Sequence, residues 1–395
     1  MKYVIQYILV VGLFLIAESC GTSSSQVNHD NQKEAVKQRI FTKADSLDFQ
    51  SKAKKLDAMF QLYHQKYGLN GNVLVAQKGK IIYEKCFGYS NILQKTSLQL
   101  ETPFQLASVS KQFTAVAILQ LVEKGLVNLN DDVKKFYPNF PYQGITIKLL
   151  LSHRAGLADY TYFCDNYVKN KSKAIYNSQV MDIMIKNKPA IYYKPDRKFN
   201  YSNTGYMILA SIVEKVAGMD FENYVKENIF EPLEMNNSFV YVKGKNIIEN
   251  KALGYSSPTV QVADDYLNGV VGDKGIYSTV GDLYKWDQGL YSGKIIKPEI
   301  LAEAFKPYNP DMKAPKNYGF GWRLYNLPDN NTVYYHRGWW RGFQNLLVRI
   351  PQDSTTIVVL RNRKTSFHVD FNEVMKVLYP NGIQVEAQTD ISSEI

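Results

Sequence analysis

The chain has 395 residues, of which 45% are hydrophobic and 21% are charged. This balance is typical of a globular protein with a large core, and it excludes a disordered or low-complexity chain. The formal net charge is +10, but the basic residues are scattered among acids without a dense Lys/Arg block, so we expect no nucleic acid partner. A mildly basic protein that faces anionic lipid or cell-wall polymer is the simpler interpretation.

The first twenty residues have the pattern of an export signal. Lys2 precedes a largely apolar run over residues 3–17, which is of signal-peptide length and short for a membrane span. Cys20 follows this run, in the place of the lipidated cysteine of bacterial lipoproteins, although Glu18 stands where a small residue is usual. We therefore expect a signal peptide over residues 1–20, a lipid anchor at Cys20 and export to the periplasmic side of the bacterial cell envelope. A cleaved signal without lipidation is the alternative.

The next segments predict a tether, a helix and a hairpin. Residues 21–45 are rich in Ser, Asn, Gln and Lys, a composition typical of a flexible linker. Apolar residues at helical spacing predict an amphipathic helix over residues 46–67. Two runs over 71–76 and 80–87 predict strands joined by a tight turn at 77–79.

Helices dominate the middle of the chain, and strands return near its end. Residues 126–260 are mostly helical by pattern, with interrupting prolines. From residue 262 the pattern predicts a glycine-bearing loop, a helix, four strands and a closing amphipathic helix, in this order: 272–279, 279–290, 321–325, 332–336, 343–350, 355–361 and 367–378.

Strands at both ends of the chain with helices between them predict an α+β fold. We expect one antiparallel sheet built from both termini and flanked by helices, with an inserted all-helical lobe. The sheet lobe takes in about 46–105 and 262–385, and the helical lobe about 106–261. Residues 386–395 are expected to form a tail.

A serine and a lysine stand at the start of the most apolar helical stretch. Ser108 and Lys111 are three residues apart, so they share a face of the helix that runs to the stop signal at Gly125. A serine hydroxyl is a poor nucleophile until a base takes its proton, and a neutral lysine can be that base. Backbone N–H groups of the same turn can stabilise a developing oxyanion. The spacing alone is weak evidence, because Ser51 and Lys54 repeat it in a polar stretch.

Two later motifs complete a candidate site. Tyr201 and Asn203 stand on a predicted turn before a helix, where a side chain can project into a cleft. The Tyr-x-Asn pattern begins at four other tyrosines, so the context alone singles out Tyr201. His336 and Gly338 follow a predicted strand, and a glycine there permits the close approach of a ligand. A lone histidine at a strand end is more often structural than catalytic.

In this order, Ser108-x-x-Lys111, Tyr201-x-Asn203 and His336-x-Gly338 resemble the three motifs of the penicillin-recognising serine hydrolases. The most similar branch comprises class C β-lactamases, D-alanyl-D-alanine carboxypeptidases, D-aminopeptidases and related esterases. Flanking strings are also similar, and the likeness covers roughly residues 50 to 380; these strings are 149–157, 229–235 and 275–279. The resemblance implies a β-lactamase/transpeptidase-like fold for residues 46–385.

The resemblance also implies a role for the residues of the first two motifs. Ser108 would form an acyl-enzyme, and Lys111 and Tyr201 would share the general-base and proton-relay work. Asn203 would hydrogen-bond Lys111 or the substrate amide. The backbone N–H groups of Ser108 and Trp339 would form the oxyanion hole.

The third motif departs from the family's usual pattern. His336 would take the place more often held by a lysine, since no Lys-Thr-Gly or Lys-Ser-Gly occurs in the chain. Arg337 replaces a hydroxyl residue that often helps to hold a β-lactam carboxylate. Arg337 or Arg341 is a candidate anchor for a substrate carboxylate, and a solvated surface arginine is the alternative for each. Trp339 and Trp340 would wall or narrow the cleft.

The remaining histidine and cysteine candidates carry weaker expectations. His153 could be a second base, but it lies in a string shared with the family, and we expect it to be structural. Cys86 and Cys164 are expected to be buried free thiols, with a disulfide as the alternative. The chain has no Cys-x-x-Cys and no His-Glu-x-x-His, so we expect no metal and no organic cofactor.

The sequence therefore predicts an exported, lipid-anchored serine hydrolase. Acyl transfer through Ser108 would act on small-molecule or peptide substrates, namely D-amino-acid peptides or amides, or small esters. One alternative is a true β-lactamase, which the departures in the third motif disfavour. Another is a non-catalytic penicillin-binding protein or cell-wall sensor, which would have no need of a lysine base.

Overall fold

The computed structural model describes residues 41–382. The predicted signal peptide, Cys20, most of the predicted linker and the predicted tail at 386–395 lie outside the described residues, so they remain predictions. Within residues 41–382, none of the helices has the length and apolar character needed to cross a membrane.

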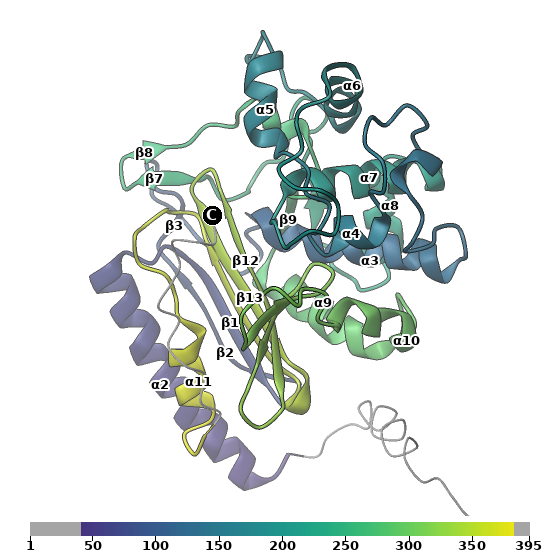
Figure 1. The fold of residues 1–395 in the computed structure, drawn as a ribbon. Helices are drawn as coiled ribbons and strands as arrows, with labels where there is room; N and C mark the ends of the chain where they lie inside the picture. The colour runs from purple at the N-terminus through teal and green to yellow at the C-terminus, as the bar shows by residue number, and fades with distance from the viewer. Residues whose placement is uncertain (1–40, 383–395) are drawn as a thin grey trace, which may run out of the picture. The chain divides into compact units, whose positions relative to one another are not determined.

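A seven-stranded antiparallel sheet organises the described part of the chain (Figure 1). The strand order is β10-β11-β12-β13-β14-β1-β2, and β1 lies beside β14 with Val73 opposite Val359. Strands from the two ends of the sequence therefore share one sheet, which confirms the predicted α+β fold. The strands are β1 (Gly71–Gln77), β2 (Lys80–Phe87), β10 (Lys316–Tyr318), β11 (Arg323–Asn326), β12 (Thr332–Trp340), β13 (Phe343–Ile350) and β14 (Thr355–Arg361).

Helices α2 (Lys43–Tyr67) and α11 (Phe371–Leu378) cover one face of this sheet (Figure 1). The Thr42 hydroxyl accepts a hydrogen bond from the Asp45 N–H, and the Asp45 carboxylate accepts one from the Thr42 N–H. This reciprocal cap fixes the start of α2 at Lys43, slightly before the predicted start at residue 46. Gly68, with a φ of 68°, ends the helix in the left-handed conformation that glycine adopts without strain.

A larger core lies on the opposite face, and α3 (Ser110–Glu123) runs through it. Every residue from Ser110 to Leu121 is buried, as the apolar pattern of this stretch predicted. Helix α3 packs against α7 (Asn203–Ala217). The other helices of this region are α4 (Ile147–Leu151), α5 (Tyr160–Tyr167), α6 (Asn177–Asn187), α8 (Phe221–Val225) and α10 (Pro298–Leu301).

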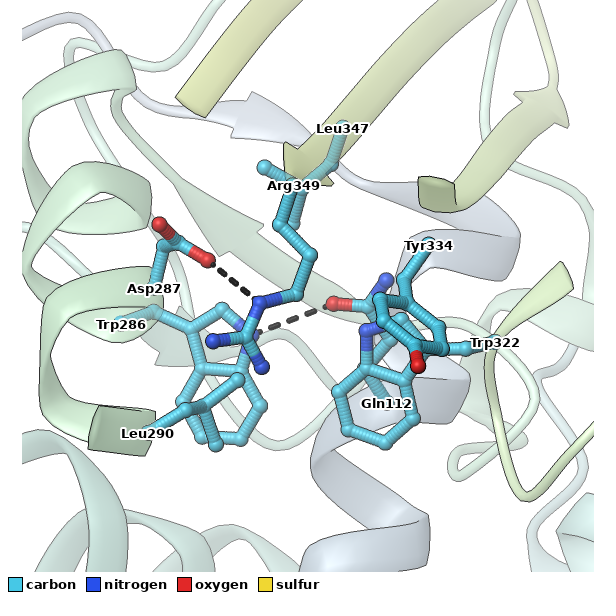
Figure 2. A pocket seen from close by; sticks show the side chains of 8 residues that line it. All are labelled: Gln112, Trp286, Asp287, Leu290, Trp322, Tyr334, Leu347 and Arg349. Atoms are coloured by element: carbon cyan, nitrogen blue, oxygen red, sulfur yellow. Dashed lines mark hydrogen bonds and ion pairs between the residues drawn. The ribbon is translucent and has the colours of Figure 1, made fainter. Parts of the chain in front are cut away.

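A buried ion pair fixes α9 (Val280–Ser292) to the sheet (Figure 2). Asp287 Oδ1 lies 2.9 Å from the Nε of Arg349 in β13, and the other carboxylate oxygen accepts a hydrogen bond from the Thr356 hydroxyl in β14. Burial raises the pKa of Asp287, and the Arg349 charge opposes that rise. The two charges neutralise each other inside a packed interface, so we assign this pair a structural role.

Short strands occur where the sequence predicted only helix or loop. β9 (Ile276–Ser278) lies inside the predicted loop at 272–279 and pairs with β5 (Phe104–Gln105) and β6 (Phe239–Val240). Strands of two or three residues carry too little periodicity to be recognised in a sequence. The other short strands are β3 (Tyr89–Asn91), β4 (Thr96–Ser97), β7 (Tyr255–Ser257) and β8 (Val260–Gln261).

Candidate active site

Ser108 lies in a short 3-10 turn, Ala107–Val109, that leads directly into α3. The preceding strand β5 is paired with β9, and the following helix is buried, so the turn is held from both sides. Ala107 adopts a left-handed φ of 51°, which is uncommon for a residue with a side chain. Ser108 is partly exposed, whereas Lys111 is fully buried. The candidate nucleophile is therefore reachable, and the candidate base is shielded from water.

The Lys111 amine is held by three oxygen atoms. Its Nζ lies 3.1 Å from Ser108 Oγ, 2.9 Å from Asn203 Oδ1 and 3.0 Å from the Asp273 carbonyl oxygen. The amide and carbonyl oxygens can only accept, so each must receive a hydrogen from the amine. The remaining position on the nitrogen faces the serine hydroxyl. In the neutral amine that position is the lone pair, and this geometry suits transfer of the serine proton to lysine.

Asp159 fixes the orientation of the Asn203 amide. One oxygen of this carboxylate accepts from the Asn203 N–H and from its Nδ2, both at 3.0 Å. The other oxygen caps α5 through the Thr161 N–H. Because Nδ2 is held by Asp159, Oδ1 turns toward Lys111. The sequence pattern did not single out Asp159.

Tyr201 lies beside the lysine amine without bonding to it. Lys111 Nζ is 4.9 Å from the centroid of the Tyr201 ring, and within the described residues the hydroxyl makes no hydrogen bond. The expected contact of this hydroxyl with Lys111 or Ser108 is therefore not formed. The amine is bonded instead to Ser108, Asn203 and the Asp273 carbonyl. The proton-relay role of Tyr201 stays a prediction.

His153 packs against Tyr201 and hydrogen-bonds the backbone of Ser202, the next residue. Its Nδ1 accepts a hydrogen bond of 3.2 Å from the Ser202 N–H, and its ring lies 4.2 Å from the Tyr201 ring, centroid to centroid. The proton of the neutral ring is therefore on Nε2. Burial, followed by the Lys111 charge, lowers the pKa of His153 well below its usual value. This geometry fits the structural role expected for His153 and gives it no contact with the nucleophile.

His336 is buried behind the site. Its Nδ1 donates to the Arg337 carbonyl at 2.6 Å, and its Nε2 accepts from the Tyr318 hydroxyl at 3.1 Å. Burial lowers the pKa of His336 well below its usual value, with Arg323 and Lys111 acting in the same direction. Both ring nitrogens are engaged, so a direct catalytic role for His336 has no geometric support here.

Gly338 allows β12 to approach the nucleophile turn. A Cβ on this glycine would lie 2.1 Å from the Leu106 carbonyl oxygen, which is too close for any residue with a side chain. Within the described strands, β11 pairs with β12 only from Thr332 to Tyr335, so β11 leaves the edge of β12 beyond that point uncovered. The Trp339 backbone lies on this segment of β12, which contacts the nucleophile turn, and its role as the second oxyanion donor stays a prediction.

The side chain of Arg337 lies on the wrong face for the predicted role. Neighbouring residues of a strand point to opposite faces, and the Arg337 guanidinium donates to the Val369 carbonyl in the core beneath α11. The Trp339 indole shares that face, 44% exposed, with Lys364 Nζ 4.9 Å from its ring. The predictions of an Arg337 anchor and of a Trp339 side chain that walls the cleft therefore need correction. Trp340 does face the larger core.

The second arginine candidate and the thiols occupy other places. Arg341 Nε donates to the Ala263 carbonyl at 3.1 Å, and its Nη2 lies 3.7 Å from Asp265 Oδ2. Cys86 is half-buried and Cys164 is buried, and both are free thiols, so the predicted disulfide alternative is not formed. Within residues 41–382 we find no group of three or more His, Cys, Asp or Glu side chains placed to bind a metal.

Comparison with known proteins gives matches over most of the chain. The family model described as Beta-lactamase matches residues 56–377. Penicillin-binding protein 4* of Bacillus subtilis (strain 168) is 36% identical over 330 residues, which cover 80% of this chain and 73% of that protein.

Two solved structures have the same fold. A penicillin-binding protein from Bacillus halodurans has a TM-score of 0.70 and 23% identity, covering 81% of this chain and 98% of that one. D-amino acid amidase from Ochrobactrum anthropi SV3, complexed with L-phenylalanine amide, has a TM-score of 0.64 and 21% identity, covering 84% of this chain and 96% of that one. At these identities the likeness shows the fold alone, and it confirms the predicted β-lactamase/transpeptidase-like architecture.

Proposed function

Because the chain belongs to the β-lactamase family of serine hydrolases, we propose that it cleaves D-amino-acid peptides, D-amino-acid amides or small esters through an acyl-enzyme at Ser108. The observation that carries this proposal is the geometry of the Lys111 amine. Two fixed acceptors direct its third position to Ser108 Oγ, 3.1 Å away. A structural lysine would need no contact with a partly exposed hydroxyl.

Acylation begins with attack of Ser108 Oγ on the substrate carbonyl carbon. The serine proton passes to the Lys111 lone pair as the new C–O bond forms, and the carbonyl electron pair becomes the oxyanion. The backbone N–H groups of Ser108 and Trp339 stabilise that charge. Collapse of the intermediate then breaks the bond to the amine or alcohol leaving group. The leaving group takes up the proton, with the Tyr201 hydroxyl as the relay.

Hydrolysis of the acyl-enzyme completes the cycle. Water attacks the ester carbon, and one of its protons passes to the Lys111 amine. The ester bond to Ser108 breaks, and its oxygen recovers a proton. The products are a free acid and the restored serine hydroxyl, so the chemistry needs no external oxidant or reductant.

The position of Arg337 favours substrates without a free carboxylate near the reacting bond. A β-lactam and a peptide that ends in D-alanine both present such a carboxylate. Of the two candidate anchors for it, Arg337 donates instead to the Val369 carbonyl on the other face of the sheet, and Arg341 donates to the Ala263 carbonyl. D-amino-acid amides and small esters therefore rank ahead of β-lactams. The family match keeps a true β-lactamase as the second candidate.

A substrate screen tests the proposal. Wild-type protein and Ser108→Ala should be assayed side by side with p-nitrophenyl esters, D-amino-acid anilides and nitrocefin. We expect turnover of the first two by wild type only. Nitrocefin as the best substrate would favour the β-lactamase. Stable labelling without product release would favour a non-catalytic binder, and equal turnover by Ser108→Ala would contradict both hydrolase candidates.

We also propose that the protein is exported and anchored at Cys20 on the periplasmic side of the cell envelope. The support is the apolar run at 3–17 followed by this cysteine. Metabolic labelling with a fatty-acid analogue should mark the wild type and spare Cys20→Ser. A wild-type protein that is exported without the label would contradict the lipid anchor and favour a cleaved signal peptide without lipidation.

A further inference from the structure

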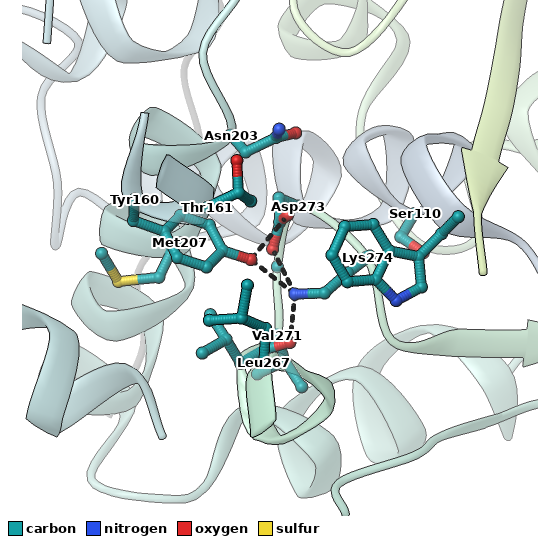
Figure 3. Close-up of polar contacts among 12 residues, drawn as sticks. Ser110, Tyr160, Thr161, Asn203, Met207, Leu267, Val271, Asp273 and Lys274 are labelled. Carbon is teal, nitrogen blue, oxygen red and sulfur yellow. Dashed lines mark hydrogen bonds and ion pairs between the residues drawn. The ribbon is translucent and has the colours of Figure 1, made fainter. Parts of the chain in front are cut away.

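Another buried lysine, Lys274, belongs to a polar cluster that also contacts the candidate base (Figure 3). Lys274 and Asp273 are adjacent in the loop that precedes β9, and they are 3% and 2% exposed. Lys274 Nζ lies 2.5 Å from the Tyr160 hydroxyl, 3.1 Å from the Val270 carbonyl and 3.6 Å from Asp273 Oδ1. The Tyr160 hydroxyl donates to the other Asp273 oxygen at 2.9 Å.

The contacts of Lys274 suit an ammonium ion paired with the Asp273 carboxylate. The single Tyr160 proton goes to Asp273, so the contact between Tyr160 and Lys274 needs a hydrogen from the lysine. The Val270 carbonyl and the Asp273 carboxylate are acceptors only. Two hydrogens of Lys274 therefore go to Tyr160 and Val270, and the third faces the Asp273 carboxylate, whose Oδ1 lies at ion-pair distance. Asp273 Oδ1 receives no hydrogen bond within the described residues, so this ion pair is its compensating contact.

This cluster also touches two of the groups that hold the candidate base. The Asp273 backbone carbonyl accepts from Lys111 Nζ at 3.0 Å, and the Asp273 side chain is fixed by Tyr160 and Lys274. Tyr160 directly follows Asp159, the residue that orients the Asn203 amide. The position of the Asp273 carbonyl and the charge of the Asp273 carboxylate, both close to Lys111, therefore depend on Tyr160 and Lys274.

We propose that Lys274 is a positioning residue for the lysine base: its buried charge neutralises the Asp273 carboxylate and keeps the Asp273 carbonyl directed at Lys111. This inference rests on the proposed function. Without Lys274, the Asp273 carboxylate would lose its ion-pair partner, and its charge would act on Lys111, which contacts the carbonyl of the same residue. An uncompensated negative charge beside Lys111 favours the protonated amine, which cannot accept the serine proton.

The groups around both lysines agree with this division of charge. Burial lowers the pKa of Lys274, and the Lys111 charge opposes protonation further, whereas Asp273 and Asp265 favour it. Burial, followed by Asp273, raises the pKa of Tyr160, so it stays a hydrogen-bond donor. The titratable groups that face Lys274 come from α3, α5 and the loops before η5 (Tyr266–Gly269) and β9, and they are Lys111, Tyr160, Cys164, Asp265 and Asp273. Those that further face Lys111 are His153, Tyr201, Tyr206 and His336.

Opposite charge changes give an experiment whose outcome structural damage cannot imitate. The rate of Ser108 labelling by a fluorophosphonate should be measured from pH 5 to 10 for wild type, Lys274→Met, Asp273→Asn and the double variant. We expect the acid limb of the profile to move up by about one pH unit in Lys274→Met and down by about one unit in Asp273→Asn. The double variant, which retains the carbonyl and removes both charges, should return toward wild type.

The controls separate this inference from the function on which it rests. Lys52→Met removes another buried lysine, one paired with Asp48 on α2, and should leave the profile unchanged. Acid limbs that do not move, or that move the same way in both single variants, would overturn the role of Lys274 alone. If Lys274→Met does not fold, the downward shift in Asp273→Asn remains decisive. A wild-type protein that is not labelled would overturn the proposed function together with this inference.

Discussion

Two regions of the molecule bury charged side chains, and they do so in different ways. Between α9 and the sheet, Asp287 and Arg349 face each other directly at 2.9 Å, and both are almost fully enclosed. At the start of α3, the buried Lys111 has no carboxylate within ion-pair distance in the described part of the chain. It is held instead by neutral oxygens, one of which belongs to the partly exposed Ser108.

The difference separates a charge that stabilises from a charge that can react. A matched buried pair has no capacity to exchange a proton without a large cost. A lysine that is surrounded by neutral acceptors can lose its proton and still keep two of its hydrogen bonds. The Asp273–Lys274 pair lies between these cases, because it is matched internally but touches the base through a carbonyl.

Removal of the base should give the largest effect on chemistry. Lys111→Ala should slow Ser108 acylation by about 10²–10⁴-fold, the usual contribution of a positioned general base. The rate of fluorophosphonate labelling measures this directly. Lys52→Ala serves as the matched control, since it removes a buried lysine from the opposite face of the sheet. If the acylation rate of Lys111→Ala stayed within a few fold of the wild-type rate, Lys111 would not be the base, and the contrast between the two regions would be wrong.

The structural pair should show the reverse pattern. Arg349→Leu leaves Asp287 as an uncompensated buried carboxylate, so we expect the free energy of unfolding to fall by about 3–5 kcal/mol. The acylation rate of the molecules that remain folded should be unchanged. Urea unfolding with an active-site titration measures both quantities, and Asp287→Asn combined with Arg349→Leu should recover stability. A rate loss without a stability loss would place this pair in the reaction.

Acid should act on the active-site region through its histidines. Burial lowers the pKa of His153 and of His336 well below the usual 6.5, so both are neutral in the folded protein. Below pH 6.5 the unfolded chain binds more protons than the folded protein does. The free energy of unfolding is therefore highest above pH 6.5, and it decreases as the pH falls below that value. Each histidine should contribute about 1.4 kcal/mol per pH unit. Urea unfolding between pH 7 and 5.5 measures the slope, His153→Asn should reduce it by one proton, and a flat profile would contradict this burial.

The smallest effect is expected at Arg337. Its guanidinium lies on the face beneath α11, so Arg337→Ala should change the KM for a carboxylate-bearing substrate by less than about twofold. Gly338→Ala is the contrasting neighbour, because its new methyl group would collide with the Leu106 carbonyl and displace β12 from the nucleophile turn. Steady-state kinetics on both variants test this assignment. A large rise in KM for Arg337→Ala alone would show that Arg337 does bind the substrate carboxylate.

Much of this arrangement could be predicted from sequence because it depends on local pattern. The spacing of Ser108 and Lys111 places both on one helix face, and the apolar residues after them predict a buried helix. The apolar runs at 343–350 and 355–361 predicted the bounds that β13 and β14 have in the structure. The face of Arg337 could also have been deduced, since it follows His336 directly in an extended strand. The prediction ended that strand too early, at residue 336 instead of Trp340.

The remaining contacts have no signature in a single sequence. The Asp273 carbonyl is a backbone atom, and any residue would provide it. Asp159 meets Asn203 across 44 positions, and Tyr318 meets His336 only because β10 and β12 belong to one sheet. The contacts of Lys111 with Asn203 and Asp273 are of the same kind, because these residues lie 92 and 162 positions away from it in the sequence. Long-range packing decides these details.

Intact-mass analysis after fluorophosphonate treatment tests the central claim most directly. We predict one adduct per wild-type molecule, mapped by proteolysis to Ser108, and no adduct on Ser108→Ala that retains the wild-type melting temperature. An unmodified wild type, or an adduct on another residue that persists in Ser108→Ala, would contradict the assignment of Ser108 as nucleophile.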